Sequence, residues 1–273
     1  MRTVTFPFFN LKFEISKVAF TLFGFDVYKY ALCIVVPILI TLIIFRFNKN
    51  NYGVKEDSVL ENAIIGLVFG IIGARLFYVL FNLNYYSQNW WKIFNLRDGG
   101  LAVYGGLILG IIAVCLNCRN SKTNYLDLLD FAAPYIPFIQ SIGRWGNFFN
   151  IEAYGTKTNS IFRMGITMGN NYMEVHPTFL YESIGCIIIC IILAISQKRR
   201  KFQGEILTKY ILMYSFIRFF IEGLRSDSLM FYNLRVSQVL SLLFFVISLV
   251  VLIKKRKNKG EKNGKSKSNG ASK

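Results

Sequence analysis

The sequence predicts an all-α, polytopic integral membrane protein with about seven transmembrane helices and a small external head subdomain. Apolar residues make up 53% of the 273 residues and charged residues only 17%, whereas soluble domains carry about a quarter. The mean hydropathy is +0.41. The Lys and Arg residues behind the net charge of +17 fall mostly in short runs next to apolar stretches, as in cytoplasmic loops. We therefore expect the lipid bilayer as a partner, and no nucleic acid.

Seven apolar stretches approach the roughly 20 residues that a helix needs to cross a bilayer. They are residues 30–45, 59–83, 101–116, 126–142, 177–195, 206–221 and 236–253. The fourth stretch contains two Asp and two Pro residues, so we expect it to be kinked and to face protein rather than lipid.

The distribution of Lys and Arg predicts how the spans are oriented. The loops after the first, third and fifth stretches, with the C-terminal tail and the nearest span ends, hold 19 of the 32 Lys and Arg. The opposite side holds 12, and Arg75 lies inside the second stretch. Because cytoplasmic segments carry the excess, we expect the N-terminus outside and the C-terminus in the cytoplasm. This arrangement requires an odd number of spans.

The same pattern predicts one membrane domain followed by a tail. We expect residues 1–253 to form a single membrane-embedded domain, with the long stretch 144–176 as its external loop or head. Residues 254–273 are rich in Lys, Gly, Ser and Asn, which predicts a disordered basic cytoplasmic tail. Residues 1–27 are interrupted by charges and lack a clean apolar core, which argues against a signal peptide.

This orientation brings unusual polar residues to the outer side of the membrane. They include Tyr30, Arg75, Tyr104, Arg144, Asn147, Asn150, Glu152, His176, Tyr181, Glu182, Arg218, Glu222, Arg225 and Asp227. Arg75, Arg144 and Arg225 come from three spans, and fixed guanidinium forks suit a lipid phosphate. The alternative for Arg144 and Arg225 is that they only reach toward the head groups. The alternative for Arg75 is an ion pair with Glu152 or Glu182.

Several other polar residues leave two interpretations open. Asn147 and Asn150 are three apart and would share one face if that stretch is helical, where their amides either orient a phosphate or glycerol group or cap the helix end. His176, which precedes Pro177, is either a general base or an interface residue. The five Cys do not make a disulfide framework, and with a single His they predict neither a metal site nor a cofactor.

The segment GRWGNFFNIEAYG at residues 143–155 resembles the signature of the prolipoprotein diacylglyceryl transferases. The similarity extends to GARLFY at 73–78, DGGLAVYGG at 98–106, HPTFLYE at 176–182, Asp130, Pro134 and the segment around Arg225. It covers most of the chain from about residue 5 to Asp227. The family is similar in its seven spans and external N-terminus, which the charge distribution predicts independently.

The resemblance implies transfer of the sn-1,2-diacylglyceryl group from phosphatidylglycerol to the lipobox cysteine thiol of a preprolipoprotein. Glycerol 1-phosphate would leave, and the reaction would be the first step of bacterial lipoprotein maturation in the cytoplasmic membrane. The residues carried over by matching motif are Tyr30, Arg144, Asn147, Gly155 and Arg225, with Arg75, Asn150 and Glu152 as supporting members. We add His176 to the substrate-binding set.

The residue chemistry fits such a reaction, with two departures from the family pattern. The minor one is Tyr30-Ala31 in the first span, where the family usually has Tyr-Gly. A thiol must lose a proton and a phosphate must leave, so the site needs positive potential. We expect Arg144 and Arg225 to hold the phosphodiester and Asn147 to position its oxygens. The family often has His where this chain has Tyr104, which leaves the general base open. Tyr104 is either a base with a lowered pKa or a hydrogen-bond donor, and we favour the donor.

The alternative function is an anionic-lipid transporter or flippase that uses the same arginines without chemistry. Transporters commonly contain matched halves, and the sequence shows no such pair. An intramembrane protease is a third class, but neither HExxH nor a known Ser or Asp motif is present.

Overall fold

The computed structural model describes residues 2–47, 54–96, 99–228, 230–232 and 234–270, and for Glu56 and residues 259–270 it describes the backbone. The chain divides into two compact units. The first comprises Met1–Thr41 and Asp130–Lys273, and the second comprises Leu42–Leu129. The division falls inside helix α1, Lys29–Phe47. We describe each unit by itself.

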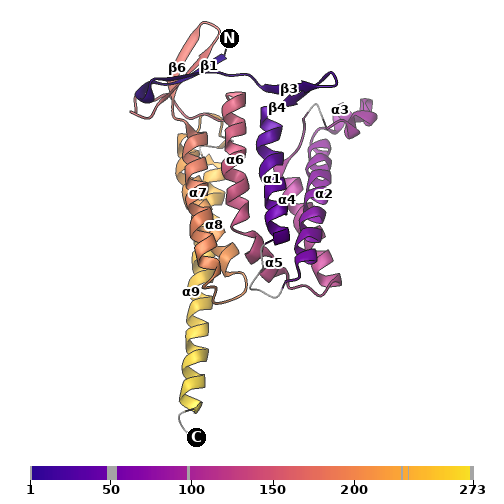
Figure 1. Cartoon of the computed structure of the whole chain (residues 1–273), viewed down its shortest axis with the longest axis vertical. Coiled ribbons are helices and arrows are strands. Elements are labelled where there is room, and N and C mark those ends of the chain that lie inside the picture. Colours follow the sequence, from indigo (N-terminus) through magenta and orange to yellow (C-terminus); the bar gives the residue numbers. More distant parts are fainter. Residues whose placement is uncertain (1, 48–53, 97–98, 229, 233, 271–273) are drawn as a thin grey trace. The chain divides into compact units, whose positions relative to one another are not determined.

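The first unit is built on four helices that pack in chain order. They are α6 (Tyr135–Asn150), α7 (Thr178–Gln197), α8 (Glu205–Leu224) and α9 (Val236–Gly270). Helix α6 packs on α7, α7 on α8, and α8 on α9 (Figure 1). Ala133, Ile189, Leu193 and Ile206 form a fully buried apolar cluster near the start of α8. Because α6 packs on α7, the last turn of α6 lies close to the first turn of α7.

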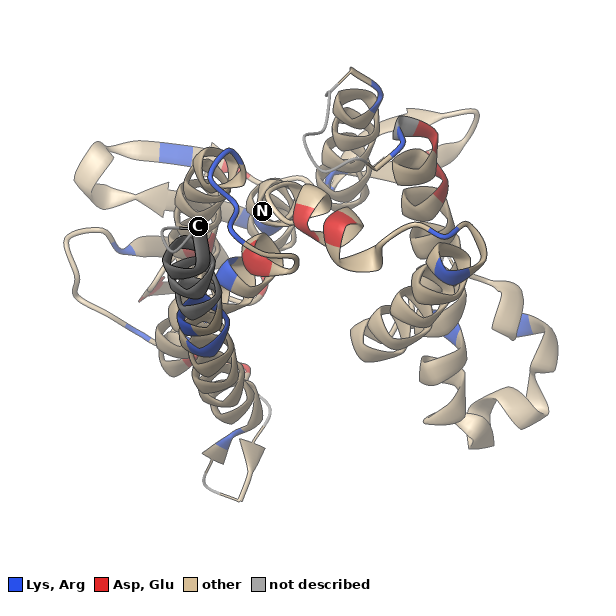
Figure 2. Cartoon of the chain, turned by 90° about the horizontal axis from the view of Figure 1, so that it is seen from below, with Lys and Arg blue, Asp and Glu red and all other residues tan. Residues whose placement is uncertain are grey.

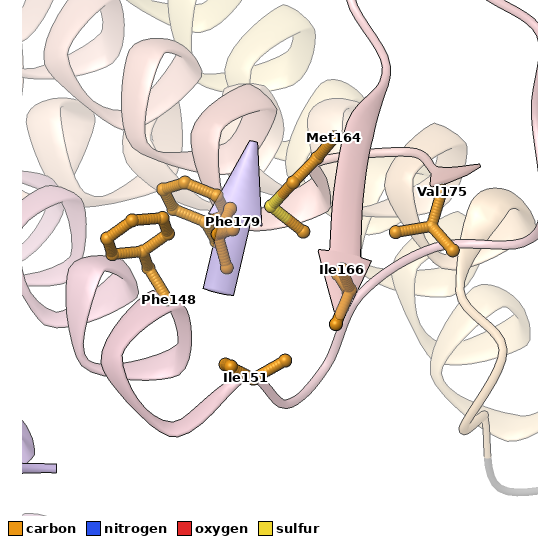
Figure 3. Close-up of a cluster of buried hydrophobic side chains, with 7 residues drawn as sticks. Phe148, Ile151, Met164, Ile166, Val175 and Phe179 are labelled. Atoms are coloured by element: carbon orange, nitrogen blue, oxygen red, sulfur yellow. The ribbon is translucent and has the colours of Figure 1, made fainter. Parts of the chain in front are cut away.

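A four-stranded antiparallel sheet lies at the end of α6 and the start of α7. Its strands are β1 (Arg2–Phe6), β2 (Leu11–Glu14), β5 (Met164–Met168) and β6 (Asn171–Val175), in the order β2-β1-β5-β6. The rings of Phe148 from α6 and Phe179 from α7 have their centroids 5.1 Å apart, tilted by 37°, and pack with the apolar residues of this sheet (Figure 3). Met164, Ile166 and Val175 complete the buried cluster. The sheet therefore fixes the loop that joins α6 to α7.

Two further hairpins belong to the first unit. Strands β3 (Val18–Leu22) and β4 (Phe25–Tyr28) form one of them, immediately before α1. Strands β7 (Met230–Phe231) and β8 (Leu234–Arg235) form the other, immediately before α9. The fold is mostly helical as predicted, but the prediction of an all-α chain is wrong in these places. The N-terminal strands alternate too weakly in hydrophobicity to be recognised alone, and one partner of β1, the strand β5, lies about 160 residues away.

The second unit is a close helix pair with short connecting elements. Helices α2 (Glu56–Leu80) and α4 (Val103–Asn120) pack along a seam of glycines. A Cβ atom on Gly73 or Gly105 would collide with the other helix, so these positions let the two backbones approach closely. Helix α3 (Leu83–Gln88) and the 3-10 helix η2 (Trp90–Phe94) connect them, and α5 (Tyr125–Ala132) follows α4.

Five helices in the described part of the chain are long and apolar enough to cross a membrane. They lie in α1, α2, α4, α7 and α9, and most of their residues are not buried inside the protein. The chain is therefore a multi-pass membrane protein. Helix α8 falls outside this set because Lys209, Arg218 and Glu222 interrupt its apolar sequence. The expected total of seven spans stays a prediction.

The fourth expected span, residues 126–142, is not one helix. It is divided between α5, which ends at Ala132, and α6, which begins at Tyr135 and continues to Asn150. Pro134 separates them, since proline lacks an N–H and its ring clashes with the preceding turn. The boundary at 142 is therefore wrong, and the GRWGN residues at 143–147 lie on helix α6.

The basic C-terminal segment follows the last apolar stretch without a break in the helix. Helix α9 continues to Gly270, and its last side chains that the structure describes include the run Lys254, Lys255, Arg256 and Lys257. Figure 2 shows these Lys and Arg residues on the helix near the C-terminus. Arg256 also pairs with the buried Glu205 at the start of α8, at 2.9 Å. The disorder of residues 254–273 and the single membrane domain stay predictions.

Candidate functional site

A buried ionic network joins α6, α7 and α8 in the first unit. Arg144 Nη2 lies 2.7 Å from Glu182 Oε1, and Arg218 Nη1 lies 3.2 Å from Glu182 Oε2. Tyr214 donates to Glu182 Oε1 at 2.8 Å. Arg218 also pairs with Glu222 at 2.5 Å, one helical turn further along α8. The two glutamates are 2% exposed, so both arginines are held by carboxylates that lie out of water.

The network follows from helical periodicity and from the packing of these helices. Residues 214, 218 and 222 are spaced four apart and therefore share one face of α8. Glu182 lies in the second turn of α7, which packs between α6 and α8. Charged groups in apolar surroundings must be paired, so the sites of these side chains depend on one another.

Arg144 keeps part of its guanidinium available. Its partners among the described residues, Glu182 and Tyr214, are both met through Nη2. Guanidinium groups carry five N–H donors, which leaves the edge formed by Nε and Nη1 to bind another group. About a quarter of the side chain is exposed. Arg144 is thus anchored on one side and accessible on the other.

The end of α6 carries two amides that share one carboxylate. Asn147 Nδ2 and Asn150 Nδ2 donate to Glu152 Oε1 at 3.0 and 3.2 Å. Helix α6 is capped at Ile151, whose φ is 53°, and the chain turns there so that Glu152 faces the two amides. Helix α6 includes both residues, so the condition under which their amides share a helix face is met. Their carboxylate partner was not predicted, because it depends on this turn.

Backbone pairing brings the remaining loop residues together. Gly155 N donates to His176 O at 2.9 Å, and Gly155 also forms a β-bridge with Arg225. A Cβ atom at Gly155 would lie 2.6 Å from that of His176 and 3.0 Å from Leu224 O, so a larger residue would push these segments apart. The segment after α6, which contains Gly155, therefore lies against both the segment before α7 and the segment after α8.

Arg225 lies just after the end of α8 and pairs with a carboxylate. Its Nε and Nη2 contact the two oxygens of Asp227 at 3.0 and 2.8 Å. These hydrogen bonds lower the pKa of the Asp227 carboxyl. His176 Nδ1 lies 3.4 Å from the Tyr181 hydroxyl.

Tyr30, in the first turn of α1, lies against α6. A Cβ atom on Gly146 would be 2.6 Å from the Tyr30 ring, so the glycine makes room for it. Eight of the ten predicted site residues therefore belong to the first unit: Tyr30, Arg144, Asn147, Asn150, Glu152, Gly155, His176 and Arg225. They lie at the ends of α6 and α8 and the starts of α1 and α7 (Figure 1).

Arg75 and Tyr104 belong to the second unit. Arg75 is 6% exposed, and its hydrogen-bond partners are backbone carbonyls in place of the expected Glu152 or Glu182. Tyr104 lies in the first turn of α4 and is more than half exposed. The roles predicted for them, a phosphate ligand for Arg75 and a hydrogen-bond donor for Tyr104, stay predictions.

The sequence analysis did not assign Tyr214, Arg218 and Glu222 to the site. The available signal was the pair of charges four residues apart within an apolar stretch. Among the described residues, no group of three or more His, Cys, Asp or Glu is arranged to hold a metal ion.

Comparison with known proteins gives a consistent result. The family model for prolipoprotein diacylglyceryl transferase matches residues 17–254, which include parts of both units. Three relatives carry the name phosphatidylglycerol–prolipoprotein diacylglyceryl transferase. The one from Clostridioides difficile is 45% identical over 89% of this chain and 98% of its own length. Those from Finegoldia magna and Enterococcus faecalis are 39% and 43% identical, over 89% and 90% of this chain and 96% and 92% of theirs. The chain belongs to the prolipoprotein diacylglyceryl transferase family.

Proposed function

We propose that this protein transfers the sn-1,2-diacylglyceryl group of phosphatidylglycerol to the lipobox cysteine of a preprolipoprotein. The thiol sulfur forms a bond to the carbon of the diacylated glycerol that carries the phosphate. The bond from that carbon to the phosphate oxygen breaks, the thiol proton is released, and glycerol 1-phosphate leaves. The relatives' names support both substrates.

The observation that carries the proposal is the half-available guanidinium of Arg144. Glu182 and Tyr214 hold it at Nη2, and its other edge matches two oxygens of a phosphodiester. Charge develops on the leaving phosphate as the carbon–oxygen bond breaks. A preorganised cation in a site of low dielectric stabilises that charge more than water does.

The other residues of the first unit have supporting roles in this proposal. Arg225 adds a second cation to the phosphodiester, and Asn147 and Asn150 orient its glycerol group. Glu152 fixes both amides, and Gly155 keeps the loop beside His176. Tyr30 packs at the start of α1. For Tyr104, a residue of the second unit, the proposed role is the one expected from the sequence, a hydrogen bond donated to the phosphodiester.

The proposal includes a membrane topology. Seven spans, formed by the five candidate helices together with α6 and α8, give an external N-terminus and a cytoplasmic C-terminus. The four-stranded sheet then lies in the external head, with the site residues of the first unit at the same end as the sheet. The positively charged run at the end of α9 supports this orientation.

The test is a transfer assay with purified protein. Vesicles of phosphatidylglycerol, or of phosphatidylethanolamine as control, are supplied with a lipobox peptide or its Cys→Ser variant. We expect the Cys peptide to gain one diacylglyceryl mass only with phosphatidylglycerol, with an equal amount of glycerol 1-phosphate released. Movement of lipid between leaflets without peptide modification would contradict the proposal and support the transporter.

A further inference from the structure

We propose that Arg75 is a positioning residue that holds the start of α4, and with it Tyr104, rather than a ligand of the substrate phosphate. This inference rests on the function proposed above. Arg75 lies near the C-terminal end of α2, and the sequence suggests a phosphate ligand there. Its contacts in the second unit favour a different role.

The guanidinium of Arg75 uses every donor that it has. Nε donates to Ile93 O at 2.8 Å, Nη1 to Gly99 O and Gly100 O at 2.7 and 3.0 Å, and Nη2 to Lys92 O and Asn95 O at 2.6 and 2.8 Å. Five N–H groups are the full set of this side chain. We call these five carbonyls the carbonyl cup.

A phosphate could bind Arg75 only by displacing the cup. A cavity of about 390 Å³ adjoins it, lined by residues including Tyr78, Tyr85 and Lys92 as well as Arg75. Space for a ligand is therefore present. The N–H groups that would bind a phosphate are nevertheless satisfied by carbonyls, and an unpaired buried carbonyl costs free energy.

The cup fits a guanidinium closely, and two glycines make this fit possible. Gly99 and Gly100 have φ angles of 80° and 78°, which turn their carbonyls toward Nη1. A Cβ atom on Gly100 would lie 2.7 Å from Arg75 Nη1 and 2.7 Å from the Tyr78 ring. The Tyr86 ring lies over the guanidinium carbon at 5.3 Å. Lysine has three donors on one nitrogen and cannot fill this arrangement.

The same turn of α2 fixes the first turn of α4. Ala102 N donates to Ala74 O at 2.9 Å, next to Arg75 in sequence. Gly105 packs against the Gly73 carbonyl and the Phe77 side chain. Tyr104 lies between these two contacts. Arg75 therefore secures the segment that enters α4, and the neighbouring residues of α2 secure the helix itself.

A positioning role predicts a loss in kcat rather than in lipid binding. Misplacement of a reacting group by about 1 Å costs roughly a hundredfold in rate. We expect Arg75→Lys and Arg75→Gln to lower kcat by at least about tenfold, to similar extents, with little change in KM for phosphatidylglycerol. A phosphate ligand would instead show a raised KM that lysine partly restores.

A charge-neutral substitution tests the cup without changing Arg75. We expect Gly100→Ala to reproduce the fall in kcat, because its Cβ enters the space of Nη1. Gly24→Ala and Gly169→Ala are matched controls, since both glycines have positive φ, lie outside the cup, and an added Cβ meets no atom within 4 Å. If all three substitutions act alike, backbone strain explains the effect and the cup does not.

Two measurements separate positioning of Tyr104 from a general structural role. In the Tyr104→Phe background, Arg75→Gln should have little further effect on kcat, whereas independent roles give additive losses. Amide exchange of residues 99–106 should be faster by about tenfold or more in Arg75→Gln, with exchange in α7 unchanged.

The outcomes distinguish this inference from the proposed function. If the wild-type protein does not transfer lipid, the proposed function fails. Additive losses, or unchanged exchange at residues 99–106 in a folded Arg75→Gln protein, would overturn the positioning role while leaving the transferase intact.

Discussion

Two arginines, one in each unit, satisfy their charge in different ways. Arg144 is held by a carboxylate and a phenol at one nitrogen, and its other edge is available. Arg75 donates to five backbone carbonyls and has no donor left. Charged residues in or next to spans are functional candidates by default, and the sequence made both arginines candidate ligands of a lipid phosphate. The comparison teaches that the donors left unused, rather than burial or charge, indicate which arginine can bind a ligand.

The largest expected effect concerns Arg144 itself. Arg144→Ala should lower the rate of transfer by at least about a hundredfold, since one aimed contact to a developing charge is worth about 2.7–4 kcal/mol. Arg144→Lys should restore little, because a point charge lacks the planar fork. Arg225→Ala should act similarly. Initial rates in phosphatidylglycerol vesicles measure this, and Arg163→Ala, at an arginine paired with Glu174 in the sheet, is the control. Near-normal rates in a folded Arg144→Ala protein would remove this residue from the site.

The carboxylate that anchors Arg144 should come next. Glu182→Gln leaves two arginines without their shared negative charge, and breaking a buried pair typically costs about 3–5 kcal/mol, less where an amide keeps a hydrogen bond. We expect a lower unfolding temperature in detergent and a fall in transfer of roughly tenfold. Glu174→Gln, in the more exposed pair with Arg163, should change neither much. Equal effects of the two substitutions would mean that Glu182 does not anchor the site.

Tyr104 tests whether the second unit contributes to the chemistry. If it donates a hydrogen bond to the phosphodiester, Tyr104→Phe should cost about 1.5–3 kcal/mol in transition-state stabilisation. If it is the general base, Phe should abolish transfer, and Tyr104→His should be active with a rate that rises around pH 6.5. We expect the first result from kcat at saturating peptide. A background rate with lipid binding intact would show that the donor role is wrong.

A smaller effect is expected when the cysteines are removed. All five are free thiols, two of them fully buried, and the proposed nucleophile belongs to the substrate. Replacing Cys33, Cys115, Cys118, Cys186 and Cys190 together by Ser or Ala should leave substantial transfer activity, with some loss of thermal stability from the buried positions. Complete loss of turnover in a folded variant would indicate a covalent enzyme intermediate instead.

The smallest effect concerns pH. Because Arg225 lowers the pKa of Asp227, the folded protein keeps this carboxylate ionised at lower pH than the unfolded chain. Its stabilising contribution is therefore fully present above the unfolded value of about 3.9 and is lost as pH falls through the folded value. Between pH 5 and 8 the rate profiles of the wild type and Asp227→Asn should have the same shape. A profile that changes shape would assign a titration in this range to the pair.

The sequence anticipated the helical part of the fold but not the sheet. Apolar stretches of 16 or more residues are local signals, and α1, α2, α4, α7 and α9 follow them closely. Strand β1 pairs with β2 nearby and with β5 about 160 residues away, and short strands have no local signal of comparable strength. The break at Pro134 was anticipated as a kink, but the extension of α6 to Asn150 was not, because the turn at Ile151 ends it.

The sequence by itself determined that the chain crosses a membrane, which family it resembles and which polar residues are unusual. These properties depend on composition, periodicity and motif, which are present before folding. The tertiary structure decided which carboxylate holds Arg144, that Asn147 and Asn150 share Glu152, and that carbonyls surround Arg75. The physical reason is that a guanidinium's partners are set by which backbone and side-chain acceptors the packing brings within about 3 Å, and residues distant in the chain supply most of them.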